Sequence, residues 1–138
     1  GRIGGEKYLI DQLRERMGFT ETIQAVLSLS ARYPNAHAKL IEDTANGPAI
    51  ISALSKKTPG LIPIRPDGSK ESRLSAISPE FEAGNIYIPA FGVYAWVPQF
   101  IEELCTFPNA KNDDCVDALS QALARFSRSM VIPRISAL

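Results

Sequence analysis

Three carboxylates stand close together near the C-terminus, at the start of a segment with helical periodicity. Asp114 and Asp117 are three residues apart and share one face of a helix, and Asp113 is four residues from Asp117. Like charges at this spacing repel each other, and a divalent cation would offset that repulsion. Hard cations such as Mg²⁺ prefer carboxylate oxygens as ligands. Asp113, Asp114 and Asp117 are therefore candidate metal ligands.

A second acidic pair follows an apolar run far upstream in the chain. Glu42 and Asp43 come directly after residues 38–41, which have the composition of a short strand. In α/β domains, sites form at the C-terminal ends of strands, where this pair would lie. Two metal ions about 4 Å apart can hydrolyse a phosphodiester when acids from separate elements hold them. The candidate catalytic residues are Glu42, Asp43, Asp114 and Asp117.

Both acidic groups also have a simpler interpretation. Carboxylates in the first turn of a helix are stabilised by the helix macrodipole, each by roughly 0.3–1 kcal/mol. Asn112 or Asp113 can serve as the N-cap of the same helix. Glu42 and Asp43 can simply begin a loop. Residue types and spacing alone leave the metal site and these structural roles open.

Other catalytic and binding chemistry has little support in the sequence. His37 is the one histidine, and no Ser or Cys nucleophile accompanies it in a recognisable context. The chain has no GxxxxGK[ST] motif, so it carries no ATPase motor of that type. Lys56, Lys70 and Arg73 are candidates for contact with DNA phosphates, although such residues more often form an ordinary solvated surface.

Composition limits the class of protein. A chain of 138 residues with 45% hydrophobic content can form one globular domain with a sizeable core, and we expect a single domain over 1–138. The formal net charge is zero, so any affinity for DNA must come from a local patch or from another part of a larger protein. No apolar run approaches the roughly 20 residues needed to span a bilayer. Cys105 and Cys115 are too few for a disulfide scaffold, and we expect free thiols.

Strands and helices are expected to alternate along the chain. Strands are expected at 7–10, 38–41, 61–64 and 85–89, and helices at 20–33, 46–54, 69–81, 98–104 and 114–128. The first strand is expected to continue through 13–17 after a turn, and 131–135 to form a strand or an extended arm. This alternation predicts an α/β domain with a partly parallel sheet.

Several stretches together, in order, resemble the C-terminal nuclease domain of phage terminase large subunits, the DNA-packaging proteins of tailed phages and prophages. The matching stretches are 8–12 with Arg14 and Arg16, then 40–50, 66–73, 78–89 and 112–119. They cover nearly the whole chain. Each motif is moderately specific by itself, and the ordered set is specific.

The resemblance implies an RNase H-like mixed sheet flanked by helices and two-metal endonuclease chemistry with Mg²⁺ or Mn²⁺. The domain would cut concatemeric double-stranded DNA at the start and end of packaging. Its implied partners are the ATPase domain of the same full-length protein, the small terminase subunit and the portal, in the cytoplasm of a bacterial host. By motif match, the ligands are Glu42 or Asp43 and then Asp114 and Asp117, with Asp113 beside them. Asn112 departs from the family, which often has His there.

A larger departure concerns the start of the chain. The family's first catalytic Asp lies on a central strand ahead of the stretch that matches 8–12, and this chain begins at Gly1. We therefore expect a fragment that lacks the first central strand and is inactive alone. Residues near the N-terminus, the segment 131–135 or a neighbouring molecule would fill the gap. The alternatives are a non-catalytic module that binds DNA or the packaging machinery, and another RNase H-like nuclease such as a resolvase or transposase core.

Overall fold

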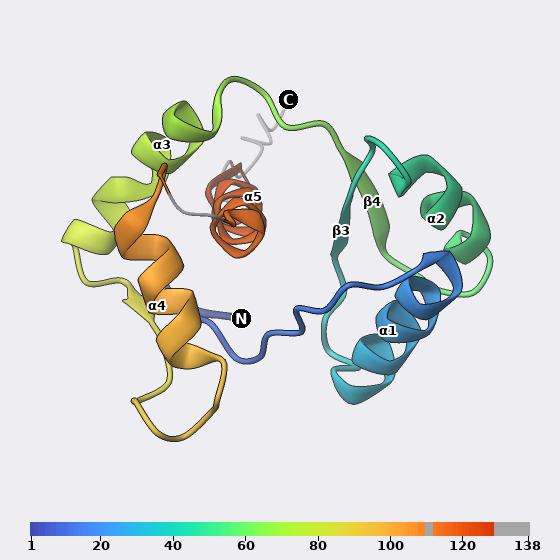
Figure 1. The fold of residues 1–138 in the computed structure, drawn as a ribbon, viewed down its shortest axis with the longest axis horizontal. Coiled ribbons are helices and arrows are strands. Elements are labelled where there is room, and N and C mark those ends of the chain that lie inside the picture. The colour runs from blue at the N-terminus through green and yellow to red at the C-terminus, as the bar shows by residue number, and fades with distance from the viewer. Residues whose placement is uncertain (110–111, 129–138) are drawn as a thin grey trace, which may run out of the picture. The chain divides into compact units, whose positions relative to one another are not determined.

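The computed structural model describes residues 1–109 and 112–128, and the chain divides into two compact units. Unit 1 combines Gly1–Gln12 with the described residues from Gly68 onward, and unit 2 is Leu13–Asp67. Figure 1 labels the helices of both units and the two strands of unit 2. Each unit is described by itself below, and a single domain over 1–138 stays a prediction.

Unit 2 is built around two parallel strands, β3 (Lys39–Glu42) and β4 (Leu61–Ile64). Helix α2 (Gly47–Leu54) connects them and contacts both strands, and α1 (Phe19–Arg32) packs on α2. Leu54 at the end of α2 is completely buried. These elements agree with the expected strands and helices. Within the described residues β4 pairs only with β3, as expected for a strand that contains a proline.

A close approach of the backbone fixes the turn that follows β3. A Cβ atom added to Gly47 would lie 1.8 Å from the carbonyl oxygen of Glu42, so only glycine fits at this position. Ala45 in the same turn has a φ of 47°, in the left-handed region that most residues avoid. Gly47 therefore allows α2 to start directly against the end of β3, beside the acidic pair.

Unit 1 contains a small mixed sheet of three short strands. Strand β1 (Arg2–Ile3) runs antiparallel to β2 (Glu6–Tyr8), and β2 runs parallel to β5 (Ile86–Tyr87). The order is β1-β2-β5. The rings of Tyr8 and Tyr87 stack across the parallel pair with centroids 4.9 Å apart. Residues near the N-terminus thus pair with one side of β2.

Three helices of unit 1 pack together through α5 (Asp114–Arg128), as Figure 1 shows. Helices α3 (Lys70–Glu82) and α4 (Val97–Thr106) both contact α5. The hydroxyl of Ser69 caps α3 by accepting a hydrogen bond from the amide of Ser72 at 3.2 Å. The buried core of this unit consists of Ile77, Val97, Phe100, Val116 and Leu123.

The continuation of the first strand through 13–17 is wrong, because these residues form no strand. The described strands form two sheets, one in each unit, and together with the helices they agree with the expected α/β fold class. The segment 131–135 lies outside the described residues. Among the described residues, no helix is long and apolar enough to cross a membrane.

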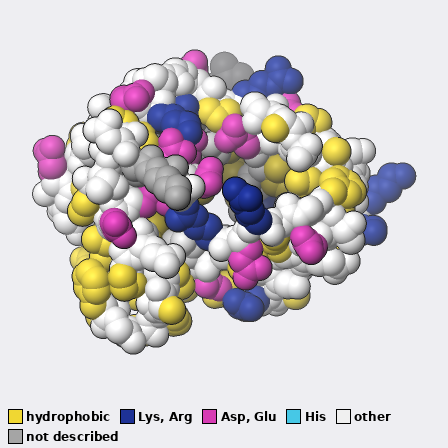
Figure 2. Space-filling view, viewed as in Figure 1, with side chains coloured by type: hydrophobic (Ala, Val, Ile, Leu, Met, Phe, Trp, Pro, Cys, Tyr) yellow, Lys and Arg dark blue, Asp and Glu magenta, His cyan; other side chains and the backbone are white. Residues whose placement is uncertain are grey.

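Apolar side chains gather on the loop between β5 and α4, where Figure 2 shows them in yellow. Phe91, Val93 and Tyr94 are 68%, 60% and 48% exposed. Trp96 stacks with Tyr94 and meets the edge of Phe100, with ring centroids 6.0 and 6.2 Å away. These aromatic rings pack against one another. The described cysteines are free thiols, also as expected.

Candidate functional site

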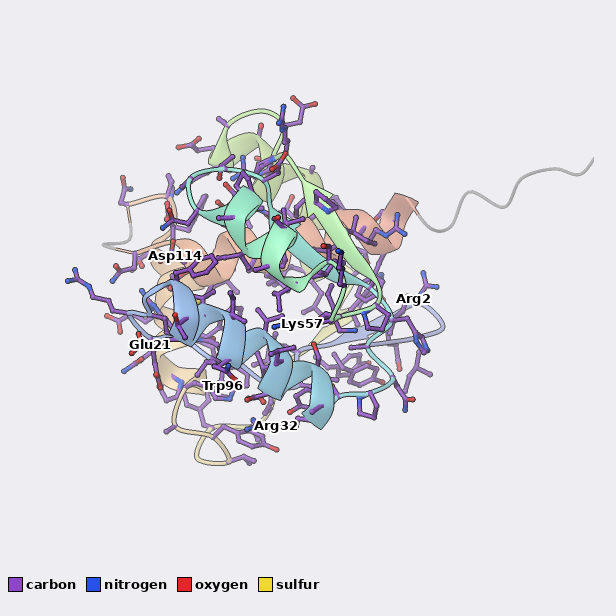
Figure 3. All side chains as sticks on the ribbon, turned by 90° about the vertical axis from the view of Figure 1, so that its right-hand side faces the viewer. Arg2, Glu21, Arg32, Lys57, Trp96 and Asp114 are labelled. Atoms are coloured by element: carbon purple, nitrogen blue, oxygen red, sulfur yellow. The ribbon has the colours of Figure 1, made fainter. Side chains whose placement is uncertain are left out.

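The acids near the C-terminus lie at the start of α5. Asp114 and Asp117 belong to its first turn, and Asp113 immediately precedes it. Figure 3 labels Asp114 at this end of the helix. Val116 and Leu123 of the same helix are buried in the core of unit 1. Acidic and apolar residues therefore separate onto different faces of α5, as their spacing predicts.

The backbone of this helix start is capped by a residue from another helix. Glu103 of α4 is only 5% exposed, and its Oε1 accepts hydrogen bonds from the amides of Cys115 at 2.8 Å and Val116 at 3.0 Å. These amides have no partner within the helix, and a local N-cap side chain normally satisfies them. Asp113 holds the N-cap position, because it precedes the helix and its carbonyl accepts a hydrogen bond from the amide of Asp117 at 2.9 Å. Glu103 adds a cap from another helix, which sequence reasoning did not predict.

Two cationic side chains of α3 hold these acids. Lys70 Nζ donates a hydrogen bond to Asp113 Oδ2 at 2.7 Å, and an Arg73 guanidinium nitrogen donates to Asp117 Oδ1. The hydrogen bond to Asp113 raises the pKa of the Lys70 ammonium, and the charges of Asp113, Asp117 and Asp114 add to this effect. All three acids therefore lie close enough to act on one ammonium group.

Arg73 is held at a second point by its other terminal nitrogen, which donates to the carbonyl of Gly68 at 3.0 Å. Its Nε is buried and has no hydrogen-bond acceptor within the described part of the chain. Arg73 and Asp117 are 16% and 17% exposed, whereas Lys70 and Asp113 are 46% and 26% exposed. The Arg73–Asp117 pair is thus better shielded from solvent than the Lys70–Asp113 pair.

The carboxylates of α5 have the chemistry of a site for a hard cation. Mg²⁺ commonly binds one or two carboxylates and keeps several waters, and two carboxylates already attract a cationic group each. In residues 1–109 and 112–128, no group of three or more His, Cys, Asp or Glu side chains is placed to share one ion. Asp113 and Asp117 are instead engaged by Lys70 and Arg73.

The upstream acidic pair lies in unit 2, at the end of β3. Glu42 is the last residue of the strand, and its Oε1 accepts a hydrogen bond from the hydroxyl of Thr44 at 2.7 Å. Asp43 follows, and its Oδ2 accepts one from Arg65 Nε at 3.0 Å. Both side chains are half-buried. The sequence left open which of the two is the ligand, and this geometry leaves both as candidates.

The structure brings some of the predicted residues together. Lys70 and Arg73, expected at DNA phosphates, instead contact Asp113 and Asp117, expected at metal ions. Lys56 belongs to unit 2, just after α2, and its side chain is exposed. The predicted site residues are therefore divided between the units, with Glu42, Asp43 and Lys56 in unit 2 and the others in unit 1.

Sequence reasoning missed Glu103, although its position carries a signal. Val97, Phe100 and Glu103 follow one another at intervals of three along α4, and all three are buried. A carboxylate on the apolar stripe of a helix must find a strong hydrogen-bond donor in the interior. The Glu103 carboxylate accepts from two amides in the first turn of α5. Arg65 was also missed, because nothing in the sequence links it to Asp43.

No curated protein and no solved structure matches this chain. The family described as a terminase RNaseH-like domain matches residues 2–126. That match agrees with the α/β fold of the described residues. The chain therefore belongs to the family of terminase RNase H-like domains.

Proposed function

We propose that this chain is the nuclease part of a phage DNA-packaging terminase and that it cuts concatemeric double-stranded DNA by two-metal hydrolysis. The observation that carries the proposal is the row of acids at the start of α5, where Lys70 donates to Asp113 at 2.7 Å and Arg73 donates to Asp117. Carboxylates that already bind cationic side chains offer the oxygen ligands that divalent ions prefer. The family to which the chain belongs supports the same conclusion.

The proposed ligands of Mg²⁺ or Mn²⁺ on α5 of unit 1 are Asp114 and Asp117, with Asp113 beside them. In unit 2, the proposed ligand is Glu42 or Asp43 at the end of β3. Two such ions activate the attacking water and stabilise the leaving oxygen when bound. The helix keeps Asp114 and Asp117 on one face, three residues apart, so their spacing does not depend on a mobile loop.

The basic residues of α3 have a second role in this proposal. When divalent ions take the carboxylates of α5, Lys70 and Arg73 lose their partners and become available to DNA phosphates. The planar guanidinium of Arg73 suits a phosphate, and its buried Nε has no acceptor among the described residues. Lys56 would add a contact from unit 2. Other partners would be the ATPase domain, the small terminase subunit and the portal, in the host cytoplasm.

The test uses the protein extended upstream by a few tens of residues, roughly one strand hairpin. We expect the extended protein to nick supercoiled plasmid with Mn²⁺, and Asp114→Asn and Asp117→Asn to abolish nicking. Glu102→Gln, which neutralises an exposed acid on α4, is the matched control and should leave nicking intact. Nicking that persists in both aspartate variants would show that the assigned ligands are wrong.

A non-catalytic binding module is the second candidate. The ion pairs from α3 to α5 favour it, because a helix packed through Lys70–Asp113 and Arg73–Asp117 could use these acids for structure alone. This alternative predicts an extended protein that binds DNA without cutting it under any divalent ion. It also predicts that Asp114→Asn leaves DNA affinity unchanged.

A further inference from the structure

A buried carboxylate connects the core of unit 1 to the start of α5. Glu103 Oε1 accepts hydrogen bonds from two consecutive amides, those of Cys115 and Val116. Glu103 lies on α4 among core residues, and its exposed fraction is 5%. Its contact with α5 therefore spans two helices that are otherwise joined by apolar packing.

Geometry makes this contact more restrictive than an ordinary cap. A local N-cap side chain moves with its own helix, so it stabilises the helix without fixing its position. Glu103 belongs to α4, whose Phe100 and Val97 are buried with it. An acceptor fixed in one helix can bind the two amides of another only when that helix has one rotation and one axial position. Asp114 and Asp117 stand on the turn that is fixed in this way.

We propose that Glu103 is a positioning residue for the metal ligands of α5, an inference that rests on the proposed nuclease function. Its carboxylate binds the helix amides and not the metal ion, and the helix dipole offsets part of the cost of burying it. Glu103 supplies the acceptor for the amides of Cys115 and Val116, while Asp113 and Asp117 accept hydrogen bonds from Lys70 and Arg73.

Two substitutions separate the hydrogen bonds from the charge. Glu103→Gln keeps an oxygen that can accept from both amides, whereas Glu103→Ala removes the acceptor. In Glu103→Ala, amide exchange at Cys115 and Val116 should become about tenfold faster, the size expected for loss of a strong N-cap. Its Mn²⁺ affinity should fall about tenfold, as for loss of a residue that orients metal ligands. Glu103→Gln should recover most of both losses.

A second destabilised variant distinguishes positioning from general loss of stability. Phe100 is 2% exposed, so Phe100→Leu removes buried apolar packing from α4. It leaves the hydrogen bonds of Glu103 in place. Exchange and Mn²⁺ titration are compared at a temperature where every variant is folded by circular dichroism. Phe100→Leu should keep the affinity of the unsubstituted chain. An equal loss in Phe100→Leu and Glu103→Ala would overturn the inference.

The outcomes also separate this inference from the proposed function. Unchanged exchange at Cys115 and Val116 in Glu103→Ala would overturn the positioning role, whatever the chain binds. Failure of the unsubstituted chain to bind Mn²⁺ would overturn the proposed metal site and, with it, the effect of Glu103 on affinity. Faster exchange together with unchanged Mn²⁺ affinity would overturn the positioning role and leave the metal site standing.

Discussion

Replacing Arg73 with glutamine should make the carboxylates of α5 bind a divalent cation more tightly. The guanidinium group of Arg73 forms an ion pair with the carboxylate of Asp117. A metal ion that binds this carboxylate must first displace the guanidinium group. Glutamine fills part of the same space but carries no charge, so Arg73→Gln removes the competitor. Lys70→Gln does the same for Asp113.

The size of the effect follows from the exposure of each pair. Exposed ion pairs such as Lys70–Asp113 contribute at most about 1 kcal/mol. The Arg73–Asp117 pair is better shielded, and two charges 4 Å apart attract by about 4 kcal/mol at an effective dielectric constant of 20. Desolvation cancels much of this attraction. About 1.4 kcal/mol of the attraction between Arg73 and Asp117 remains, so the Mn²⁺ dissociation constant falls about tenfold in Arg73→Gln. The weaker Lys70–Asp113 pair gives a smaller change, about threefold, in Lys70→Gln.

Calorimetric titration with Mn²⁺ at pH 7 and low salt measures these constants. Without Mn²⁺, Arg73→Gln should unfold at a lower temperature than the unsubstituted chain, because Asp117 is left half-buried without its cation. Saturating Mn²⁺ should narrow this difference in unfolding temperature, because a ligand that binds only the folded state stabilises it more when its dissociation constant is lower.

Lys57→Gln is the matched control, since it removes the same charge from an exposed side chain of unit 2. It measures how far net charge alone changes Mn²⁺ affinity. If Arg73→Gln binds Mn²⁺ no more tightly than Lys57→Gln, the guanidinium does not compete with a metal ion, and the argument from the α3 cations is refuted.

Two further predictions concern stability. Gly47→Ala should lower the free energy of unfolding by about 3 kcal/mol, the upper range for one substitution, because the new Cβ would meet Glu42 O at 1.8 Å; Gly5→Ala, where a Cβ meets nothing within 4 Å, is the control in urea unfolding. Lys7 Nζ, 2.6 Å from Glu80, lowers the pKa of the Glu80 carboxyl below its ordinary 4.5. The resulting stability is complete above pH 4.5 and is lost as the pH falls through the lower folded-state pKa. Thermal unfolding from pH 7 to 3 should therefore show a shallower decline in Glu80→Gln, and an unchanged slope would contradict the pairing.

Local sequence patterns predicted the helices well. Helix α5 runs from Asp114 to Arg128 as expected, because Val116 and Leu123 repeat at helical spacing behind a polar start. The turn 46–48 likewise predicted the start of α2. Strand β1 was missed, since it has two exposed residues that are ordered by their pairing with β2. A strand this short has no periodicity to detect.

The contacts of the candidate site depend on packing between helices, which no local pattern encodes. The sequence assigned Arg73 to DNA and Asp117 to a metal ion, and only the contact of α3 with α5 makes them partners. Glu103 was predicted to lie on a helix, but its role depends on where α5 begins. Residue types identified the acids, whereas the arrangement around them required the fold.

The acids at the start of α5 are held by ion pairs that a divalent ion would have to replace. Lys70 binds Asp113 and Arg73 binds Asp117, whereas Glu103 of α4 binds the helix amides. The N-terminus of the helix, equivalent to roughly half a positive charge, also favours acids at this position. In the proposed function, Lys70 and Arg73 would turn to DNA phosphates, and the acids that they leave would be available to the metal ions that two-metal chemistry requires.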